Sequence, residues 1–394
     1  EAAGSNGTLP LMLTLHPTSS AKPWLKRPHV EAFALWLDLD GGMGRTGIAP
    51  GQAAATLYKL IGQLPGVEPA GLHLYDGHLH DSDPTERLAK WQMMMDGVRS
   101  FRAELETAGL PVPGVVAGGT PTFPFHTWLP PAHTDAPAIG SAVLAGVLLK
   151  MGTYGFVRIA MPMLPQSWRS WAWVIVVVGI VSVLYGALVA LAQKNLKRMI
   201  AYTSVNHMGY IVMALGAAGL IAGSTAEARS IAVTGAVTQM VSHGLITGAL
   251  FLLAGVLYDR AGTYELDAYG GLAGAAPKLA TLFAVGAFAS LGLPGFSGFI
   301  AEFQMFTGSI AAAPVTAVAL PGIVLTAALF LRAFQQVFTG SAGGRSEGFV
   351  DLRAHETVPT ATLLALSLVI GVLPGPLLAL IEPAADTVIS LLGR

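Results

Sequence analysis

The chain has 394 residues, a net charge of −1 at pH 7 and no cysteine, and only 11% of its residues are charged. The near-zero charge gives no sign of nucleic-acid binding, and the lack of cysteine excludes disulfides, iron–sulfur clusters and thiolate metal sites. The mean hydropathy of +0.59 and the charged fraction of 11% are both typical of a membrane protein. An average soluble domain has about 25% charged residues.

Charged residues are concentrated in the first third of the chain. Residues 1–120 carry 21 of the 45 charged side chains, and the rest of the chain consists of long apolar stretches separated by Pro, Gly and charge. This contrast predicts two domains: a small α/β segment at 1–120 and a transmembrane helix bundle at 121–394. The expected fold class is therefore mainly α, a polytopic bundle preceded by an incomplete βα segment.

The first domain alternates between predicted strands and helices. Residues 33–51 indicate a strand and a Gly-rich loop before a helix at 52–64, and 71–81 indicate a second strand before a helix at about 84–108. A third strand is expected within 112–122. The alternation favours parallel βα units, but 120 residues are too few for a (β/α)₈ barrel, which needs about 250.

The second domain contains about seven apolar segments, each long enough to cross about 30 Å of hydrocarbon. The fifth segment is interrupted by the sequence Gly-Leu-Pro-Gly at 292–295, which predicts a broken helix of the kind that lines ion pathways in transporters. The expected spans are 138–160, 171–193, 199–220, 230–257, 278–310, 313–338 and 358–381.

Lys and Arg are more frequent in the loops after the second, fourth and sixth spans than in the other loops. Because such residues favour the cytoplasmic side, we expect the N-terminus in the cytoplasm, the C-terminus outside, and a location in the bacterial inner membrane.

Four ionisable side chains lie deep within the expected spans: Lys150, His207, His243 and Glu302. A central Lys costs about 2.5–3.5 kcal/mol on insertion scales, so these groups are expected to face the bundle interior, where they can exchange protons. A single buried His is more often a structural residue, but four such groups on different spans of one bundle favour a proton or cation relay. The spacing of these four groups does not suggest a metal site. In the first domain, a cluster of possible metal ligands is better explained as a solvated loop: His73, His78, His80, Asp81 and Asp83.

The membrane part, over about residues 124–382, resembles the M-type antiporter-like subunit of bacterial NADH–quinone oxidoreductase, complex I. The resemblance rests on four segments: PFHTWLPPAHTDAPAIGSAVLAGVLLKMGTYGFVRI (124–159), KRMIAYTSVNHMGY (197–210), GAVTQMVSHGLITGALFLLAGVLYDR (235–260) and LGLPGFSGFIAEF (291–303). It implies that Lys150 is a central lysine between two half-channels and that Glu302 is the carboxylate of the second. It also implies that His126, His207 and His243 belong to the pathway.

The same resemblance implies a non-redox, proton-translocating subunit without a cofactor, which neighbours the L-type and N-type subunits in the lipid bilayer and does not bind quinone directly. Cation/proton antiporter and membrane hydrogenase subunits remain alternatives. The family has fourteen spans, and its first repeat is nearly absent here; its other key lysine corresponds to Gly119. We therefore expect a truncated and impaired proton pathway.

Residues 33–124 resemble a second family, the barrel of D-threonine aldolase and alanine racemase-type PLP enzymes. The resemblance rests on DLDGGMGRTG, LHLYDGH and VVAGGTPTFP. It implies that Arg45 lies near the cofactor and that Gly118, Gly119 and Thr120 lie near its phosphate. The family's Schiff-base lysine has no clear counterpart, so PLP is expected only as a vestigial ligand and the segment is expected to be inactive.

The two resemblances meet at about residue 124, where GGTPTFP ends one and PFHTW begins the other. We interpret the chain as a chimera, from gene fusion or sequence assembly. The leading function is a truncated M-type proton-translocating subunit; a PLP-dependent enzyme fragment and an inert fusion product are the alternatives.

Overall fold

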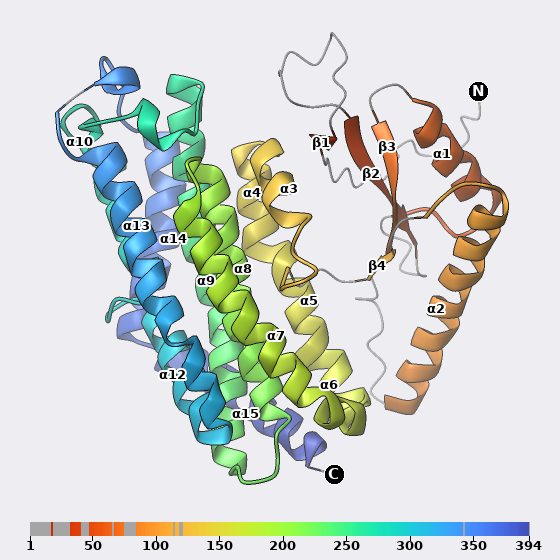
Figure 1. Cartoon of the computed structure of the whole chain (residues 1–394). Coiled ribbons are helices and arrows are strands. Elements are labelled where there is room, and N and C mark those ends of the chain that lie inside the picture. Colours follow the sequence, from red (N-terminus) through yellow and green to blue (C-terminus); the bar gives the residue numbers. More distant parts are fainter. Residues whose placement is uncertain are drawn as a thin grey trace. The chain divides into compact units, whose positions relative to one another are not determined.

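The computed structural model describes residues 17–18, 32–40, 47–64, 67–74, 84–112, 115–117, 121–341 and 343–393. The chain divides into two compact units, Glu1–Gly119 and Thr120–Arg394 (Figure 1). The first is a small α/β unit and the second is a helix bundle, so the predicted fold class is confirmed.

The first unit contains a four-stranded sheet with the order β1-β2-β3-β4, in which β2, β3 and β4 are parallel and β1 is antiparallel to β2. The expected βα alternation is therefore present, although β3 begins before the predicted residue 71. The elements are β1 (Pro17–Thr18), β2 (Ala32–Leu39), α1 (Gln52–Gln63), β3 (Val67–Leu74), α2 (Pro84–Thr107) and β4 (Val115–Ala117).

The core of the first unit lies between the sheet and the two helices. Leu37 and Leu72 are buried against Tyr58 and Phe101. The Tyr58 hydroxyl donates a 2.9 Å hydrogen bond to the carbonyl of Pro111, and burial, with the nearby charge of Glu106, raises the pKa of Tyr58 to about 12. Alternate residues of a strand face opposite sides, so this core covers one face of the sheet.

The second unit is a bundle whose helices run side by side (Figure 1). Its α-helices are α3 (Leu129–Asp135), α4 (Ala138–Val143), α5 (Leu149–Gly155), α6 (Met161–Met163), α7 (Pro165–Ala192), α8 (Leu196–Ala218), α9 (Ala226–Ala261), α10 (Leu272–Ala275), α11 (Pro277–Ser290), α12 (Ser297–Ala312), α13 (Pro321–Phe338), α14 (Ala354–Val372) and α15 (Gly375–Leu392).

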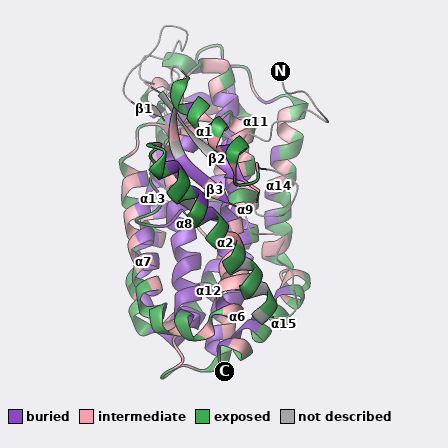
Figure 2. Cartoon of the chain, turned by 90° about the vertical axis from the view of Figure 1, so that its right-hand side faces the viewer, coloured by how far each residue is buried: buried purple, intermediate pink, exposed green. Residues whose placement is uncertain are grey.

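Helix α9 is the centre of the bundle and packs against α4, α8, α11, α12, α14 and α15. In its most apolar window 78% of the residues are buried, and α8 is likewise buried over most of its length (Figure 2). Small residues let helices approach closely: a Cβ at Gly179 of α7 would lie 2.5 Å from the backbone nitrogen of Met213 in α8. His207 on α8 and His243 on α9 therefore lie inside protein.

The fifth expected span is broken, as predicted. Helix α11 ends at Ser290 and α12 begins at Ser297, and the turn between them contains Gly292 and Gly295 at φ angles of +76° and +103°. A residue with a side chain adopts such angles only with strain, so the two glycines allow the helix to stop and restart inside the bundle.

The seventh expected span, 358–381, is wrong as a single helix. The structure has two helices, α14 and α15, with a break at Leu373 and Pro374, because Pro cannot continue the hydrogen bonding of the helix before it. Glu356, near the start of α14, contacts Arg260 at the end of α9, and Asp386 of α15 contacts Ser230 at the beginning of α9. The two helices together therefore follow the length of α9.

Among the described residues, six helices or helix runs are long and apolar enough to cross a membrane. The predicted third span is not among them, although α8 is a buried 23-residue helix. Asn206 and His207 lie in the middle of α8, and such polar residues lower the mean hydropathy of this helix. The predicted fifth span is also not among them, because it is divided into α11 and α12. The spans that meet the criterion are Ala138–Met163, Pro165–Ala192, Ala226–Ala261, Pro314–Phe338, Ala354–Val372 and Gly375–Leu392.

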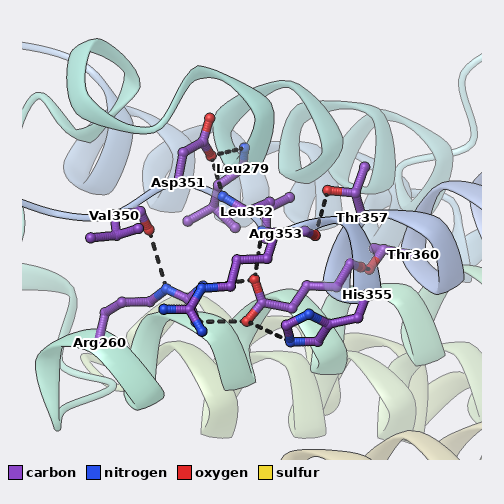
Figure 3. A network of polar contacts seen from close by, with 10 residues as sticks. Arg260, Leu279, Val350, Asp351, Leu352, Arg353, His355, Thr357 and Thr360 are labelled. Carbon is purple, nitrogen blue, oxygen red and sulfur yellow. Dashed lines mark hydrogen bonds and ion pairs between the residues drawn. The ribbon is translucent and has the colours of Figure 1, made fainter.

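A polar network ties the beginning of α14 to the end of α9 and to the beginning of α11 (Figure 3). The guanidinium of Arg260 donates two hydrogen bonds of 2.7 and 2.6 Å to the carboxylate of Glu356, and its Nε donates to the carbonyl of Val350. The Asp351 carboxylate accepts from the backbone N–H groups of Lys278 and Leu279 in the first turn of α11. We call these contacts the Arg260–Glu356 clasp.

Candidate functional site

Lys150 lies on an irregular stretch of the first membrane helix run. A π-helical turn, Leu144–Leu148, separates α4 from α5, and Lys150 is the second residue of α5. Its ammonium group donates a hydrogen bond to the carbonyl of Ala145 within this turn. π-helical turns change the direction of the following side chains and occur often at functional sites, and here the turn directs Lys150 into the bundle, where it is 8% exposed.

The side chain of Lys150 reaches His243 of the central helix α9. Lys150 Nζ lies 2.6 Å from His243 Nδ1, and His243 is 1% exposed. A hydrogen bond between two nitrogens requires that one of them accepts, so the ammonium and the imidazole share a proton. An imidazole can take up a proton at one ring nitrogen and release one from the other, so His243 can pass a proton across its ring.

His207 of α8 continues the polar series beyond His243. The two imidazole centroids are 5.4 Å apart. The amide nitrogen of Gln239 in α9 lies 3.2 Å from His207 Nδ1. The amide donates this bond, so Nδ1 accepts and the ring proton is on Nε2. Gln239 was not among the predicted site residues, although it lies one helical turn before His243.

A narrow pocket joins these histidines to Glu302. It has about 180 Å³ of empty volume but admits a water molecule only if side chains move. The carboxylate of Glu302 on α12 packs against the backbone of Gly292, where a Cβ atom would collide with Oε2. The pocket is lined by His207, Gln239, Ser242, His243, Ile246, Thr247, Ala289, Ser290, Gly298 and Glu302.

Several polar atoms around this pocket are buried without a hydrogen-bond partner among the described residues. They include Nε2 of both His207 and His243, Oε1 of Gln239 and Oγ of Ser290. Buried polar groups are nearly always paired with protein or water. Their concentration around one pocket indicates a place suited to water and proton transfer.

A chain of three buried hydroxyls lies beside the pocket. Ser242 Oγ of α9 is 2.8 Å from Ser297 Oγ of α12, which is 2.7 Å from Ser367 Oγ of α14. All three serines are fully buried. Sequence reasoning missed them, because Ser is common in membrane helices and nothing in its spacing indicates that three helices meet at one point.

His126 does not line the pocket of His207 and His243. It lies before α3, and its ring contacts Phe123 and Tyr185 with centroid distances of 5.8 and 4.8 Å. Burial lowers the pKa of His126 below its usual value of 6.5. The structure therefore brings together four of the five predicted pathway residues, Lys150, His243, His207 and Glu302.

His133 and Lys197 are among the buried ionisable residues that were not predicted as site residues. His133 of α3 is fully buried and stacked on Phe251 at 4.4 Å. Lys197 is also fully buried, donates to the carbonyls of Thr134 and Ala136, and lies 5.0 Å from the ring centroid of Tyr264.

The predicted cofactor residues of the first unit, Arg45, Gly118, Gly119 and Thr120, lie outside the described residues. In the described part of that unit, His73 of β3 is bonded to Asp38 of β2 at 2.8 Å. No group of three or more His, Cys, Asp or Glu side chains suited to a metal ion occurs among the residues that the structure describes.

Sequence comparisons match each unit to a different family. Residues 107–329 match the profile described as "NADH:quinone oxidoreductase/Mrp antiporter, TM", and residues 10–146 match "Alanine racemase, N-terminal domain". The two matches overlap around the boundary between the units at residues 119 and 120. This arrangement supports the interpretation of the chain as a chimera.

Relatives of the membrane unit are curated as "NADH-quinone oxidoreductase subunit M". The protein of Rickettsia prowazekii is 41% identical over 261 residues, which are 66% of this chain and 51% of the relative. That of Rhodobacter capsulatus is 42% identical over 266 residues, 67% of this chain and 50% of the relative. The chain thus spans about half the length of the curated relatives it matches.

The membrane unit is also similar to a solved structure, "Respiratory complex I from Thermus thermophilus with bound NADH". The TM-score is 0.64 with 35% sequence identity, over 70% of this chain and 56% of that one. The profile match covers more than half of the chain. The curated relatives and the solved structure point to the same family as this profile. The chain belongs to the NADH:quinone oxidoreductase/Mrp antiporter transmembrane family.

Proposed function

We propose that the membrane unit is a proton-conducting, non-redox M-type chain of an NADH–quinone oxidoreductase. The observation that carries this proposal is the 2.6 Å contact between Lys150 Nζ and His243 Nδ1 beside the pocket that His243 shares with Glu302. The relatives curated as subunit M support the M type over antiporter and hydrogenase subunits.

The proposed relay has two steps. A proton passes between Lys150 and His243 along their direct contact, and the free Nε2 atoms of His243 and His207 then exchange it with the carboxylate of Glu302 through the pocket. Because the pocket is too narrow for a standing water molecule, the second step requires side-chain movement that lets water in. No metal or organic cofactor takes part in either step.

Proton flux in liposomes tests this relay. With an imposed pH gradient and a pH-sensitive dye inside the vesicles, we expect a passive proton flux above that of protein-free liposomes. Lys150→Ala and Glu302→Ala should abolish it, whereas Lys278→Ala, which changes an exposed lysine, should leave it unchanged. A flux that survives Lys150→Ala, or no flux from the parent chain, would contradict the proposal.

Driven pumping should be absent, because Gly119 stands where the resemblance places the input lysine. When this chain replaces an intact M-type subunit in complex I, we expect NADH oxidation without restored proton pumping by that subunit. Restored pumping that depends on Lys150 would refute this part of the proposal. The proposed partners are the L-type and N-type subunits and the lipid bilayer.

The proposed orientation has the N-terminus in the cytoplasm and the C-terminus outside. The loops near Asn195, Glu265 and Glu356 lie at one end of the bundle, since Asn195 contacts Glu265 and Arg260 contacts Glu356. This end also carries most of the Lys and Arg residues of the loops, which favours the cytoplasmic side. Single cysteines at exposed Ala222 and Glu347 should react with impermeant thiol reagents from opposite sides; reaction from the same side would exclude this topology.

The profile match at 10–146 supports a second, vestigial function for the first unit, binding of PLP. We propose that it forms no internal aldimine, because Lys22 and Lys26 do not occupy a first barrel strand in the sequence pattern and a Schiff base needs a positioned lysine. Incubation with PLP followed by borohydride should fix no pyridoxyl group to either lysine. A fixed group would show that the first unit retains its cofactor chemistry.

A further inference from the structure

Helix α14 contacts the broken segment of the α11–α12 pair at two points one turn apart. The hydroxyl of Ser367 is 2.7 Å from that of Ser297, the first residue of α12. One turn later, Gly371 packs on the backbone of Gly295 and Phe296, where a Cβ atom would collide with both. The first contact is on the first residue of α12, and the second is on the turn immediately before it.

Ser297 is held from the other side as well. Its hydroxyl is 2.8 Å from that of Ser242 on the central helix α9, so the start of α12 is fixed between α9 and α14. No side chain caps this helix at Phe296. Glu302 follows Ser297 by five residues, about one and a half turns, so the position of its carboxylate depends directly on where α12 begins.

Most of the surface of α14 is exposed in the described part of the chain. Only 17% of its most apolar window is buried, and the buried residues form a single stripe of Thr360, Leu364 and Ser367 that leads to Gly371. The beginning of the helix is anchored separately, by the Arg260–Glu356 clasp. Between these anchors the outer face of α14, with Val358 and Leu366, is exposed.

We propose that Ser367 and Gly371 are positioning residues for Glu302. They hold the turn at residues 291–296 against α9, so that the carboxylate of Glu302 stays packed on Gly292 and directed into the pocket. The inference rests on the proposed function, in which Glu302 exchanges protons with His207 and His243. It assigns to α14 a role that does not involve transferring protons.

The effect of α14 on Glu302 is steric, because this helix presents no charge to the pocket. The titratable residues of α14 are His355 and Glu356, both in its first turn and at the clasp. The groups that face Glu302 come from the other elements packed on α12: His207 and Tyr210 from α8, and His243 from α9. Changes at residues 367 and 371 leave all three groups in place.

Infrared spectroscopy of the full chain in detergent tests the inference without measuring transport. The C=O stretching band of protonated Glu302 is assigned by its loss in Glu302→Gln and followed as a function of pH. We expect Ser367→Ala and Gly371→Ala each to move the midpoint of this titration by about one pH unit. Thermal unfolding confirms that each variant is folded.

Two matched controls are available, one on α14 and one on α15. Thr362→Ala removes a hydroxyl from the exposed face of α14, and Gly375→Ala adds a methyl group to α15 where no atom lies within 4 Å. Both should leave the midpoint unchanged. Ser367→Ala introduces no new atoms, so it decides the outcome even if Gly371→Ala does not fold.

Three results would overturn the inference, each in a distinguishable way. An unchanged midpoint in Ser367→Ala would show that Ser367 does not position Glu302. An unchanged midpoint with reduced proton flux in liposomes would identify the three serines as a proton conduit instead. If the parent chain shows no titrating Glu302 band, the proposed function fails, and this inference fails with it.

Discussion

The contacts of Lys150 explain how a charged residue is accommodated at the centre of a membrane helix. Its insertion costs about 2.5–3.5 kcal/mol, and the side chain finds two partners inside the protein, the carbonyl of Ala145 and His243 Nδ1. The same two contacts hold the amine in place for proton exchange. Accommodation and function therefore depend on the same atoms.

Gly292 is the residue whose substitution should affect the site most directly. Gly292→Ala places a Cβ atom against the Glu302 carboxylate and strains a backbone at φ +76°. We expect a loss of about 2–3 kcal/mol of unfolding free energy, since such strain costs about 1–3 kcal/mol and the carboxylate must also move. Thermal unfolding in detergent measures this loss.

Gly295→Ala is the matched control, because Gly295 also has a positive φ but no atom within 4 Å of an added Cβ. Gly295→Ala should lose only the part of the unfolding free energy that arises from backbone strain. Combining Gly292→Ala with Glu302→Ala removes the collision with the carboxylate. The double variant should therefore recover the extra loss of unfolding free energy by which Gly292→Ala exceeds Gly295→Ala. Equal losses in both glycine variants would show that the contact with Glu302 has no energetic consequence.

At the scale of elements, the clasp determines where α14 begins. Arg260 and Glu356 are 15% and 14% exposed and form a bidentate pair, which gives both geometric specificity and more energy than an exposed ion pair. Asp351 in the same loop binds the first N–H groups of α11. The loop thereby sets the starting points of two of the helices that surround the pocket.

Removing one partner of the clasp should destabilise the bundle. Arg260→Ala leaves the Glu356 carboxylate partly buried without its main partner, and we expect a loss of about 2 kcal/mol, below the 3–5 kcal/mol of fully buried pairs. Arg260→Lys should recover only part of this loss, because an ammonium group cannot form the bidentate pair. Thermal unfolding measures the losses of both Arg260 variants, with Lys278→Ala as the surface control. Full recovery of stability in Arg260→Lys would contradict the argument that the bidentate pair matters.

At the scale of the whole molecule, the two units differ in how completely their elements are covered. In the second unit, α8 and α9 are surrounded by other helices. In the first unit, β4 pairs only with β3 among the described residues, so the outer edge of this parallel strand has no neighbouring strand there. Parallel sheets are normally covered on both faces, and open edges are sites of instability.

Limited proteolysis should therefore cut the first unit well before the second. With the chain in detergent micelles and a protease of broad specificity, we expect early cleavage within residues 1–118 and a persistent fragment that contains residues 121–393. Mass spectrometry identifies the fragments. Protection of residues 1–118 over the same period would show that the partial barrel is a stable domain.

The sequence alone determined the features that depend on composition and local pattern. Charge predicts the division at about residue 120, the length of the apolar segments predicts the helical membrane part, and Gly and Pro predict the broken helix at 292–295. Each of these signals is local, because it depends only on residues that are close together in the sequence. Lys150, His207, His243 and Glu302 could be identified for the same reason, since an ionisable group in an apolar span is conspicuous.

Only the tertiary structure decided which of these groups meet. The contact of Lys150 with His243 joins positions 93 residues apart, and the serine chain joins α9, α12 and α14. His126, in a matching motif, lies against Phe123 and Tyr185 instead. Proton transfer requires donor and acceptor atoms within about 3 Å. The distances between helices that bring such atoms together depend on close packing at small residues and on the clasp, and no local sequence pattern encodes them.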